Sequence, residues 1–251
     1  MTTIGDRFKD YEIVTRTALP RRAWTVIRLD GRAFHSFTRG MQRPFDAAFA
    51  DAIDRTAQVL CGEVSGTVLA YTQSDEISLI LEPGGITTQP WFNGEIQKIV
   101  SVTASLAAAV FNPIIGKPSA GVFDSRVFTV PDQGDAANYL IWRQRDATRN
   151  SLSMAAQSQF SHKTLQGKSG SEMQDMLFNA GINWNDYPAR FKRGGMVVRR
   201  SGEQIFEFIR RDTGAHETAT AMRSWWEVDA APHFTFDTAV ATLSTTNLVD
   251  L

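Results

Sequence analysis

The sequence predicts an α+β fold in which helices lie on one face of an antiparallel sheet. Three observations carry this prediction. Residues 24–29 (WTVIRL) are rich in β-branched and aromatic side chains and stop at an Asp-Gly pair, as a buried strand does. Residues 45–64 follow a proline and repeat their apolar side chains at helical spacing. Residues 64–71 and 77–81 are apolar runs around the turn-like tetrapeptide TQSD, which predicts a β-hairpin.

The next elements complete a known supersecondary order. Residues 91–111 read as a helix, residues 120–130 alternate like a strand, and residues 132–159 are mostly helical. The order strand, helix, hairpin, helix, strand is that of the ferredoxin-like βαββαβ unit.

The C-terminal pattern is weaker. Residues 196–200 favour a further strand, residues 203–211 fit a strand or a helix, and residues 213–221 fit a polar loop or a helix. We therefore predict a catalytic domain over residues 1–200 and a C-terminal elaboration, residues 201–251, packed on the same domain.

Composition indicates a folded, globular chain rather than a disordered or disulfide-stabilised one. Of 251 residues, 43% are hydrophobic, and the formal net charge is −1, so any RNA site must be a local basic patch. The single cysteine, Cys61, suits the reducing cytoplasm. No signal peptide is evident, and no stretch approaches the roughly 20 apolar residues that span a bilayer, so we expect a cytoplasmic location and no membrane partner.

Acidic residues end the predicted central strands. Asp30 follows the first strand, and Asp75 with Glu76 lies at the hairpin tip. In a βαββαβ sheet these strands are neighbours, so the carboxylates meet at one edge and repel unless a cation lies between them. Oxygen ligands favour Mg²⁺, and two such ions can hold the attacking and leaving oxygens of a phosphoryl-type transfer. Taken singly, each residue is equally an ordinary turn residue.

Two further features are compatible with phosphate binding. The loop from Gly31 to His35 can present successive N–H groups to a triphosphate, with Arg32 or Arg43 adding charge. For His35 we favour packing at the sheet edge over a general base.

Basic residues form two groups that suit RNA or an ordinary solvated surface. They are Arg143, Arg145 and Arg149 in one helix, and Arg190, Lys192, Arg193, Arg199 and Arg200 near Trp184 and Phe191.

The motifs taken together resemble the tRNA-His guanylyltransferases and the related template-dependent 3′-to-5′ polymerases. The similar stretches, in order, are LDGRAFHSF with RPFD (29–46), AYTQSDEISLIL (70–81), FDSRV (123–127), WRQRD (142–146), MLF (176–178), GINWN (181–185) and FKRGG (191–195). They cover the chain from about residue 6 to residue 200.

The resemblance implies a polymerase-palm-like fold, a homotetramer, two Mg²⁺ ions, GTP and ATP as substrates, and tRNA as the partner. It implies Asp30 and Asp75 as catalytic metal ligands, together with the Gly31 carbonyl. The nucleotide contacts it implies are Gly31, Arg32, Ala33, Phe34, His35, Arg43, Ser74, Lys98, Arg126 and Asn150. For tRNA we assign Arg143, Arg145, Arg149, Lys192 and Arg193.

One departure concerns specificity. Eukaryotic members read HINNLYN where this chain has Thr148, Arg149, Asn150 and Ser151. The change resembles the template-dependent branch, so we expect GMP or templated nucleotides to be added to a tRNA 5′ end. The alternatives are a tRNA 5′-end repair polymerase without tRNA-His specificity, a palm-fold nucleotide cyclase, and a catalytically silent RNA-binding module.

Overall fold

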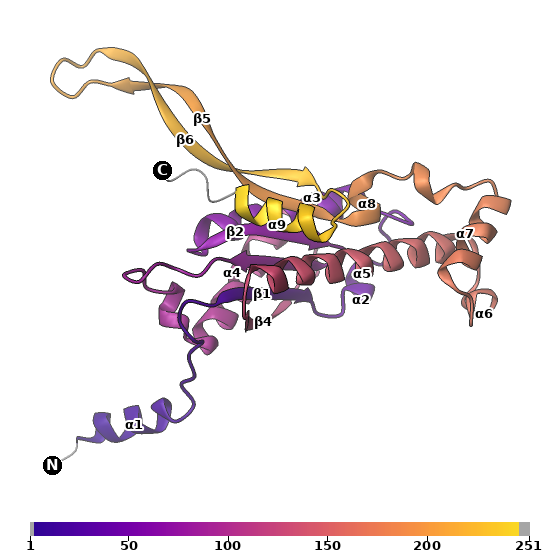
Figure 1. Cartoon of the computed structure of the whole chain (residues 1–251), viewed down its shortest axis with the longest axis horizontal. Coiled ribbons are helices and arrows are strands. Elements are labelled where there is room, and N and C mark those ends of the chain that lie inside the picture. The colour runs from indigo at the N-terminus through magenta and orange to yellow at the C-terminus, as the bar shows by residue number, and fades with distance from the viewer. Residues whose placement is uncertain (1–2, 246–251) are drawn as a thin grey trace.

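A six-stranded antiparallel sheet forms the centre of the molecule. The computed structural model describes residues 3–245, and the strand order in its sheet is β4-β1-β3-β2-β5-β6 (Figure 1). The strands are β1 (Trp24–Gly31), β2 (Thr67–Gln73), β3 (Glu76–Leu81), β4 (Phe123–Val130), β5 (Gly195–Ile209) and β6 (His216–Ala230). The first four have the order that the ferredoxin-like prediction requires.

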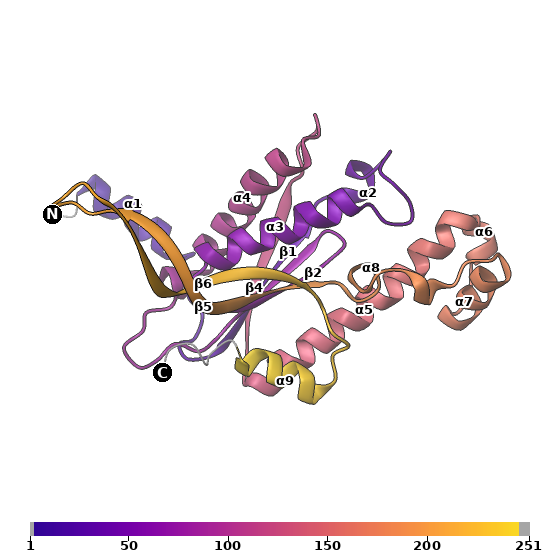
Figure 2. The same ribbon diagram turned by 90° about the horizontal axis from the view of Figure 1, so that it is seen from above.

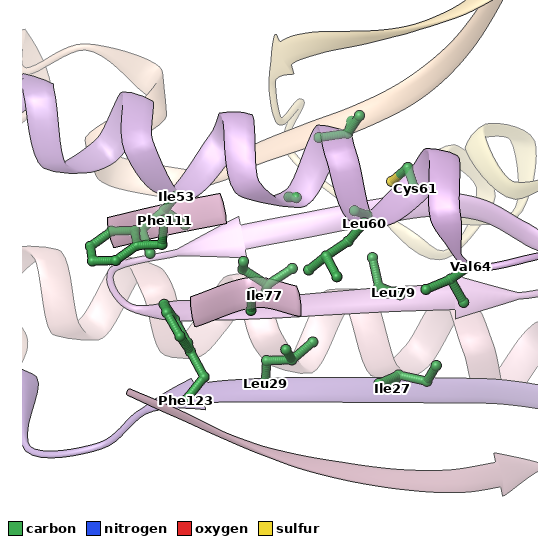
Figure 3. Packing of buried hydrophobic residues seen from close by; sticks show 14 of the residues in the cluster. Ile27, Leu29, Ile53, Leu60, Cys61, Val64, Ile77, Leu79, Phe111 and Phe123 are labelled. Atoms are coloured by element: carbon green, nitrogen blue, oxygen red, sulfur yellow. The ribbon is translucent and has the colours of Figure 1, made fainter. Parts of the chain in front are cut away.

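Two crossover helices cover one face of this sheet. Helix α3 (Ala47–Glu63) connects β1 to β2, and α4 (Ile96–Ile115) connects β3 to β4 (Figure 2). Their inner faces bury Leu60 and Phe111 against Ile27 and Leu79 of the sheet (Figure 3). Alternate residues of a strand face the same side, so this core takes the odd-numbered positions of β1 and β3.

The other face of the sheet is covered as well, which corrects the expectation of helices on one face only. Helix α5 (Gln133–Gln159) and α9 (Phe236–Thr245) pack there, and a second core joins Val26, Tyr71 and Ile80 to Leu140 and Leu243. The inner stripe of α5 is rich in alanine, a residue that does not mark a helix face as buried.

The far half of α5 supports a group of short helices. These are α6 (His162–Leu165), α7 (Gly170–Asn179), η2 (Trp184–Asp186) and α8 (Ala189–Arg193). Helices α6 and α7 lie beside the end of α5 (Figure 2). Their Leu165 and Leu177 form a small core with Ala155 and Ala156 of α5.

Strands β5 and β6 continue beyond the sheet as a long two-stranded arm (Figure 1). The alternative of a loop or helix over residues 213–221 is wrong, because residues 216–230 are one strand paired with β5 along its length. A two-stranded ribbon exposed on both faces has no buried side to impose alternation, so its sequence carries little strand signal. The domain boundary at residue 200 falls within β5 and stays a prediction.

The remaining elements lie outside these layers or link them. Helix α1 (Ile4–Ile13) stands away from the sheet and buries none of its side chains (Figure 1). Short segments α2 (Phe34–Phe37) and η1 (Trp91–Gly94) precede α3 and α4.

Helix α4 corrects the expectation that no segment is long and apolar enough to cross a bilayer. It is 20 residues long, and an 18-residue stretch of it has a mean hydropathy of 1.6. In this fold its Ile99, Thr103, Ala107 and Phe111 stripe packs into the core.

Candidate active site at the end of the central strands

Asp30 and Asp75 meet at one edge of the sheet, as the topology predicts. Asp30 lies near the end of β1, directly opposite Glu76 of β3. The N–H of Gly31 donates to the carbonyl oxygen of Asp75 at 3.1 Å. The backbone therefore holds the end of β1, with Asp30, beside the turn that carries Asp75.

Asp75 lies in a two-residue turn between the paired residues Gln73 and Glu76. Its turn partner, Ser74, has a left-handed φ of +46°, and Ala33, in the loop after β1, has a φ of +57°. Residues other than glycine adopt this conformation at a cost and keep it where the surrounding structure holds them. Both strained residues line the same cavity.

Burial and mutual repulsion shape the charges of the pair. Burial raises the pKa of Asp75 to about 6, and the neighbouring Asp30 carboxylate contributes to the rise. The pKa of Asp30 is also raised, first by burial and then by Asp124 on β4, while Arg126 and Arg28 oppose the rise. Ionising both carboxylates is costly without a positive charge between them.

This donor set fits Mg²⁺. The ion is commonly held by one or two carboxylates and completes its shell with water and substrate phosphates. Within residues 3–245 there is no group of three or more His, Cys, Asp or Glu side chains suited to a metal, so substrate oxygens would be needed. Asp30 and Asp75 would hold the ion, which would lower the pKa of a bound hydroxyl and neutralise phosphate charge.

A cavity of about 550 Å³ opens beside Asp75. Its walls come from four stretches of the chain: the loop after β1 with the start of α3, the β2–β3 turn, the second half of α5, and α8 with Gly194. Of the residues predicted to bind nucleotide, those that line it are Gly31, Ala33, Phe34, His35, Arg43, Ser74 and Asn150. A volume of this size is typical of small-molecule sites.

Three predicted nucleotide contacts lie outside this cavity. Arg32 is exposed, and its N–H donates to the Val122 carbonyl at 2.8 Å. Lys98, in the first turn of α4, forms an ion pair with Glu95 at 3.6 Å. Arg126 pairs with Asp124 and lies near Asp30 rather than on the cavity wall.

The predicted RNA residues divide by exposure. Arg143 is buried and bidentate to Glu76, with both nitrogen–oxygen distances 2.7 Å, so its guanidinium presents no surface to RNA. Arg145 is exposed, and Arg149 is 72% exposed and pairs with Asp146.

The two predicted RNA residues of α8 are both half-buried. The Lys192 ammonium lies 5.6 Å from the centre of the Trp184 ring. The carbonyl of Arg193 accepts the Tyr71 hydroxyl at 2.6 Å.

Sequence reasoning missed two features of the cavity wall. Arg190 lines the cavity and is bidentate to the buried Asp54 of α3, at 2.7 and 2.9 Å. Phe45 and Phe191 stack at 4.9 Å between ring centres and close one side. No local signal identifies these pairs, because their members are 136 and 146 positions apart in the chain.

Comparison with known proteins assigns the chain to a family. The sequence profile described as tRNAHis guanylyltransferase matches residues 5–131, just over half of the chain and the part that carries Asp30 and Asp75. This protein belongs to the tRNA(His) guanylyltransferase family. The tRNA(His) guanylyltransferase of Schizosaccharomyces pombe is 32% identical over 218 residues, which are 78% of this chain and 80% of that protein.

Solved structures extend the likeness beyond the profile. A bacterial tRNA(His) guanylyltransferase-like protein in complex with ATP has a TM-score of 0.82 and 39% identity, and covers 96% of this chain and 97% of its own. The Saccharomyces cerevisiae tRNA(His) guanylyltransferase has a TM-score of 0.67 and 26% identity, over 75% of this chain and 91% of its own. This guanylyltransferase-family member is thus a nucleotidyltransferase with the palm-like fold of the family.

Proposed function

We propose that this enzyme adds nucleotides to the 5′ end of a tRNA, so that the RNA grows in the 3′-to-5′ direction. The 3′-hydroxyl of an incoming GTP attacks a 5′ phosphate that is activated with ATP or is already a triphosphate. The new phosphodiester bond forms as pyrophosphate or AMP leaves. The pairing of Asp30 with Asp75 beside a nucleotide-sized cavity is the observation that carries the proposal.

The chain's own residues mainly position the reactants. Backbone N–H groups around Ala33 and Ser74, both held in left-handed conformations, are suited to a triphosphate. Asp30 and Asp75 provide the negative charge that gathers Mg²⁺, which would supply the acidity of the hydroxyl and the neutralisation of phosphate. Arg43 on the cavity wall adds a charge-assisted donor.

The RNA specificity we propose is broad. Asn150 lines the cavity, while Arg149 beside it is exposed and carries a guanidinium where the eukaryotic HINN stretch has its isoleucine. An exposed guanidinium can bind any backbone phosphate, and a phosphate contact carries no information about the base. Repair of truncated tRNA 5′ ends by templated addition is therefore the favoured activity, and addition of GMP to tRNA-His is one case of it.

The decisive experiment combines purified protein with Mg²⁺, ATP, labelled GTP, and either tRNA-His or a 5′-truncated tRNA, and then sequences the 5′ ends. We expect extension of both RNAs. Asp30→Ala and Asp75→Ala should abolish transfer, whereas Asp135→Ala, an exposed carboxylate near the start of α5, should not. Cyclic GMP formed without tRNA would indicate a nucleotide cyclase, and RNA binding without any transfer would indicate a silent binding module.

Two further parts of the proposal concern assembly and location. We propose a homotetramer, for which sedimentation should give about four times the 27.9 kDa of one chain. We also propose that the enzyme acts in the cytoplasm, where tRNA and nucleoside triphosphates are available. Fractionation of cells that express the tagged protein tests this location.

A further inference from the structure

Glu76, the acidic residue directly after Asp75, is tied into the protein instead of facing the cavity. Its side chain is buried, and Arg143 of α5 grips it with Nε and Nη2, both at 2.7 Å. Gln73 and Ser78 donate more weakly at 3.4 Å. The Glu76 carboxylate thus accepts hydrogen bonds from β2, β3 and α5, and these intramolecular bonds occupy both of its oxygens.

A second contact lies one helical turn away. The hydroxyls of Tyr139 and Ser78 are 2.7 Å apart. Tyr139 and Arg143 are four apart on α5 and share a face, while Glu76 and Ser78 are two apart on β3 and share a face. Helix α5 therefore contacts the first part of β3 at two successive positions. The Arg143–Glu76 contact is the one nearer the β2–β3 turn.

The conformation of the β2–β3 turn depends on contacts of this kind. Ser74 is held in a left-handed conformation, which persists only where neighbouring contacts enforce it. On one side the turn is tied by Gly31, whose N–H donates to the Asp75 carbonyl. On the β3 side, the first residue after the turn whose side chain is held by other residues is Glu76. Loosening Glu76 would free the Ser74–Asp75 peptide to relax and would move the Asp75 carboxylate.

We propose that Arg143 is a positioning residue of the transfer site: by holding Glu76, it fixes Asp75 in the geometry that binds the divalent cation. This inference rests on the proposed function, because it assumes that Asp75 is a metal ligand. It also gives the first arginine of the WRQRD motif a role other than RNA contact. Partners that orient a metal ligand from outside the coordination shell typically change metal affinity by about 10–100-fold when they are mutated.

Further contacts hold the Arg143 side chain in place. It shares Asp146 with Arg149, at 2.9 Å from its own Nη2, and its guanidinium carbon lies 4.5 Å from the Trp142 ring centre. Its planar fork is therefore held on two carboxylates and one ring face. Lysine offers a single point charge and cannot reproduce this bidentate geometry.

The test uses three variants of the full chain. Arg143→Lys keeps the charge but loses the fork. The double variant Glu76→Gln, Arg143→Met removes both buried charges, so that it avoids the penalty of one unpaired charge. Tyr139→Phe, the matched control, removes the hydrogen bond between Tyr139 of α5 and Ser78 of β3 and leaves Arg143–Glu76 intact. For each we would measure Mn²⁺ affinity by electron paramagnetic resonance, the Mg²⁺ dependence of transfer, and the thermal midpoint.

We expect Arg143→Lys and the double variant to bind Mn²⁺ at least tenfold more weakly and to need correspondingly more Mg²⁺, with KM for tRNA unchanged. Tyr139→Phe should lower the thermal midpoint without changing Mn²⁺ affinity. Wild-type Mn²⁺ affinity in the double variant would overturn the proposal and leave the pair a purely structural one. A rise in KM for tRNA with unchanged Mn²⁺ affinity would also overturn it, in favour of RNA binding.

These outcomes are separate from failure of the proposed function. If the wild-type protein extends no RNA, that function fails, while the Mn²⁺ affinities still decide whether Arg143 positions Asp75.

Discussion

Replacing Asp75 by asparagine should stabilise the metal-free protein while abolishing catalysis. The native carboxyl group is half-buried beside Asp30, and the partial burial is the main cause that raises its pKa to about 6. The folded protein therefore holds a proton on Asp75 between roughly pH 4 and pH 6, where the unfolded chain has already lost it. Stability falls as the pH rises through this window, and above it the ionised carboxylate destabilises the fold.

The size of this effect follows from the pKa difference. The ordinary value is 3.8 and the native value is about 6. Because one pKa unit corresponds to about 1.4 kcal/mol, ionisation costs at most about 3 kcal/mol at pH 8. Asp75 is only half-buried and solvent screens part of the repulsion, so we expect Asp75→Asn to gain about 2 kcal/mol.

Urea unfolding in EDTA, at pH 8 and at pH 4.5, measures the prediction. The variant should exceed the wild type in free energy of unfolding at pH 8, and most of the difference should vanish at pH 4.5. Added Mg²⁺ should stabilise the wild type more than the variant, because the ligand is gone. An Asp75→Asn protein that is less stable than wild type at pH 8 without metal would refute the reasoning.

Three further predictions follow from the same structure. Gly31→Ala should destabilise the protein by about 2 kcal/mol in urea unfolding, since the new Cβ would lie 2.5 Å from the Phe34 ring; an unchanged midpoint would show that the ring can move aside. Phe111→Ala should cost about 3–5 kcal/mol in the same assay, because the ring is fully buried in the core over the sheet, and a loss below 1 kcal/mol would contradict that packing. Arg149→Ala should weaken tRNA binding and lower the slope of log affinity against log salt by about 0.8 while leaving GTP affinity unchanged; an equal salt slope would remove Arg149 from the RNA surface.

Much of the site was accessible from the sequence because the metal-ligand candidates sit at strand ends. The apolar run before Asp30 and the hairpin around Asp75 fix two neighbouring strands, and strand order then brings the carboxylates together. The seven motifs in order added the family, which the comparisons confirm. The nucleotide-binding and RNA-binding roles of the individual residues stay predictions.

Local sequence did not predict the contacts made between distant elements. The Arg143–Glu76 pair joins residues 67 positions apart, and Arg190–Asp54 joins residues 136 apart. An arginine in a helix has the same local pattern whether it faces solvent or a buried carboxylate, so the sequence alone predicts an RNA contact for Arg143. The arm of β5 and β6 escaped prediction for the related reason that no buried face imposes a pattern on it.

The sequence by itself determined the βαββαβ core and the meeting of Asp30 with Asp75, because burial enforces periodicity and turn residues end each strand. Only the tertiary structure decided that α5 covers the second face of the sheet, that its Arg143 holds Glu76, and that the cavity beside Asp75 is walled by four separate segments. These features depend on which surfaces pack together in the folded protein. The residues that form them are far apart in the sequence, so no local pattern predicts them.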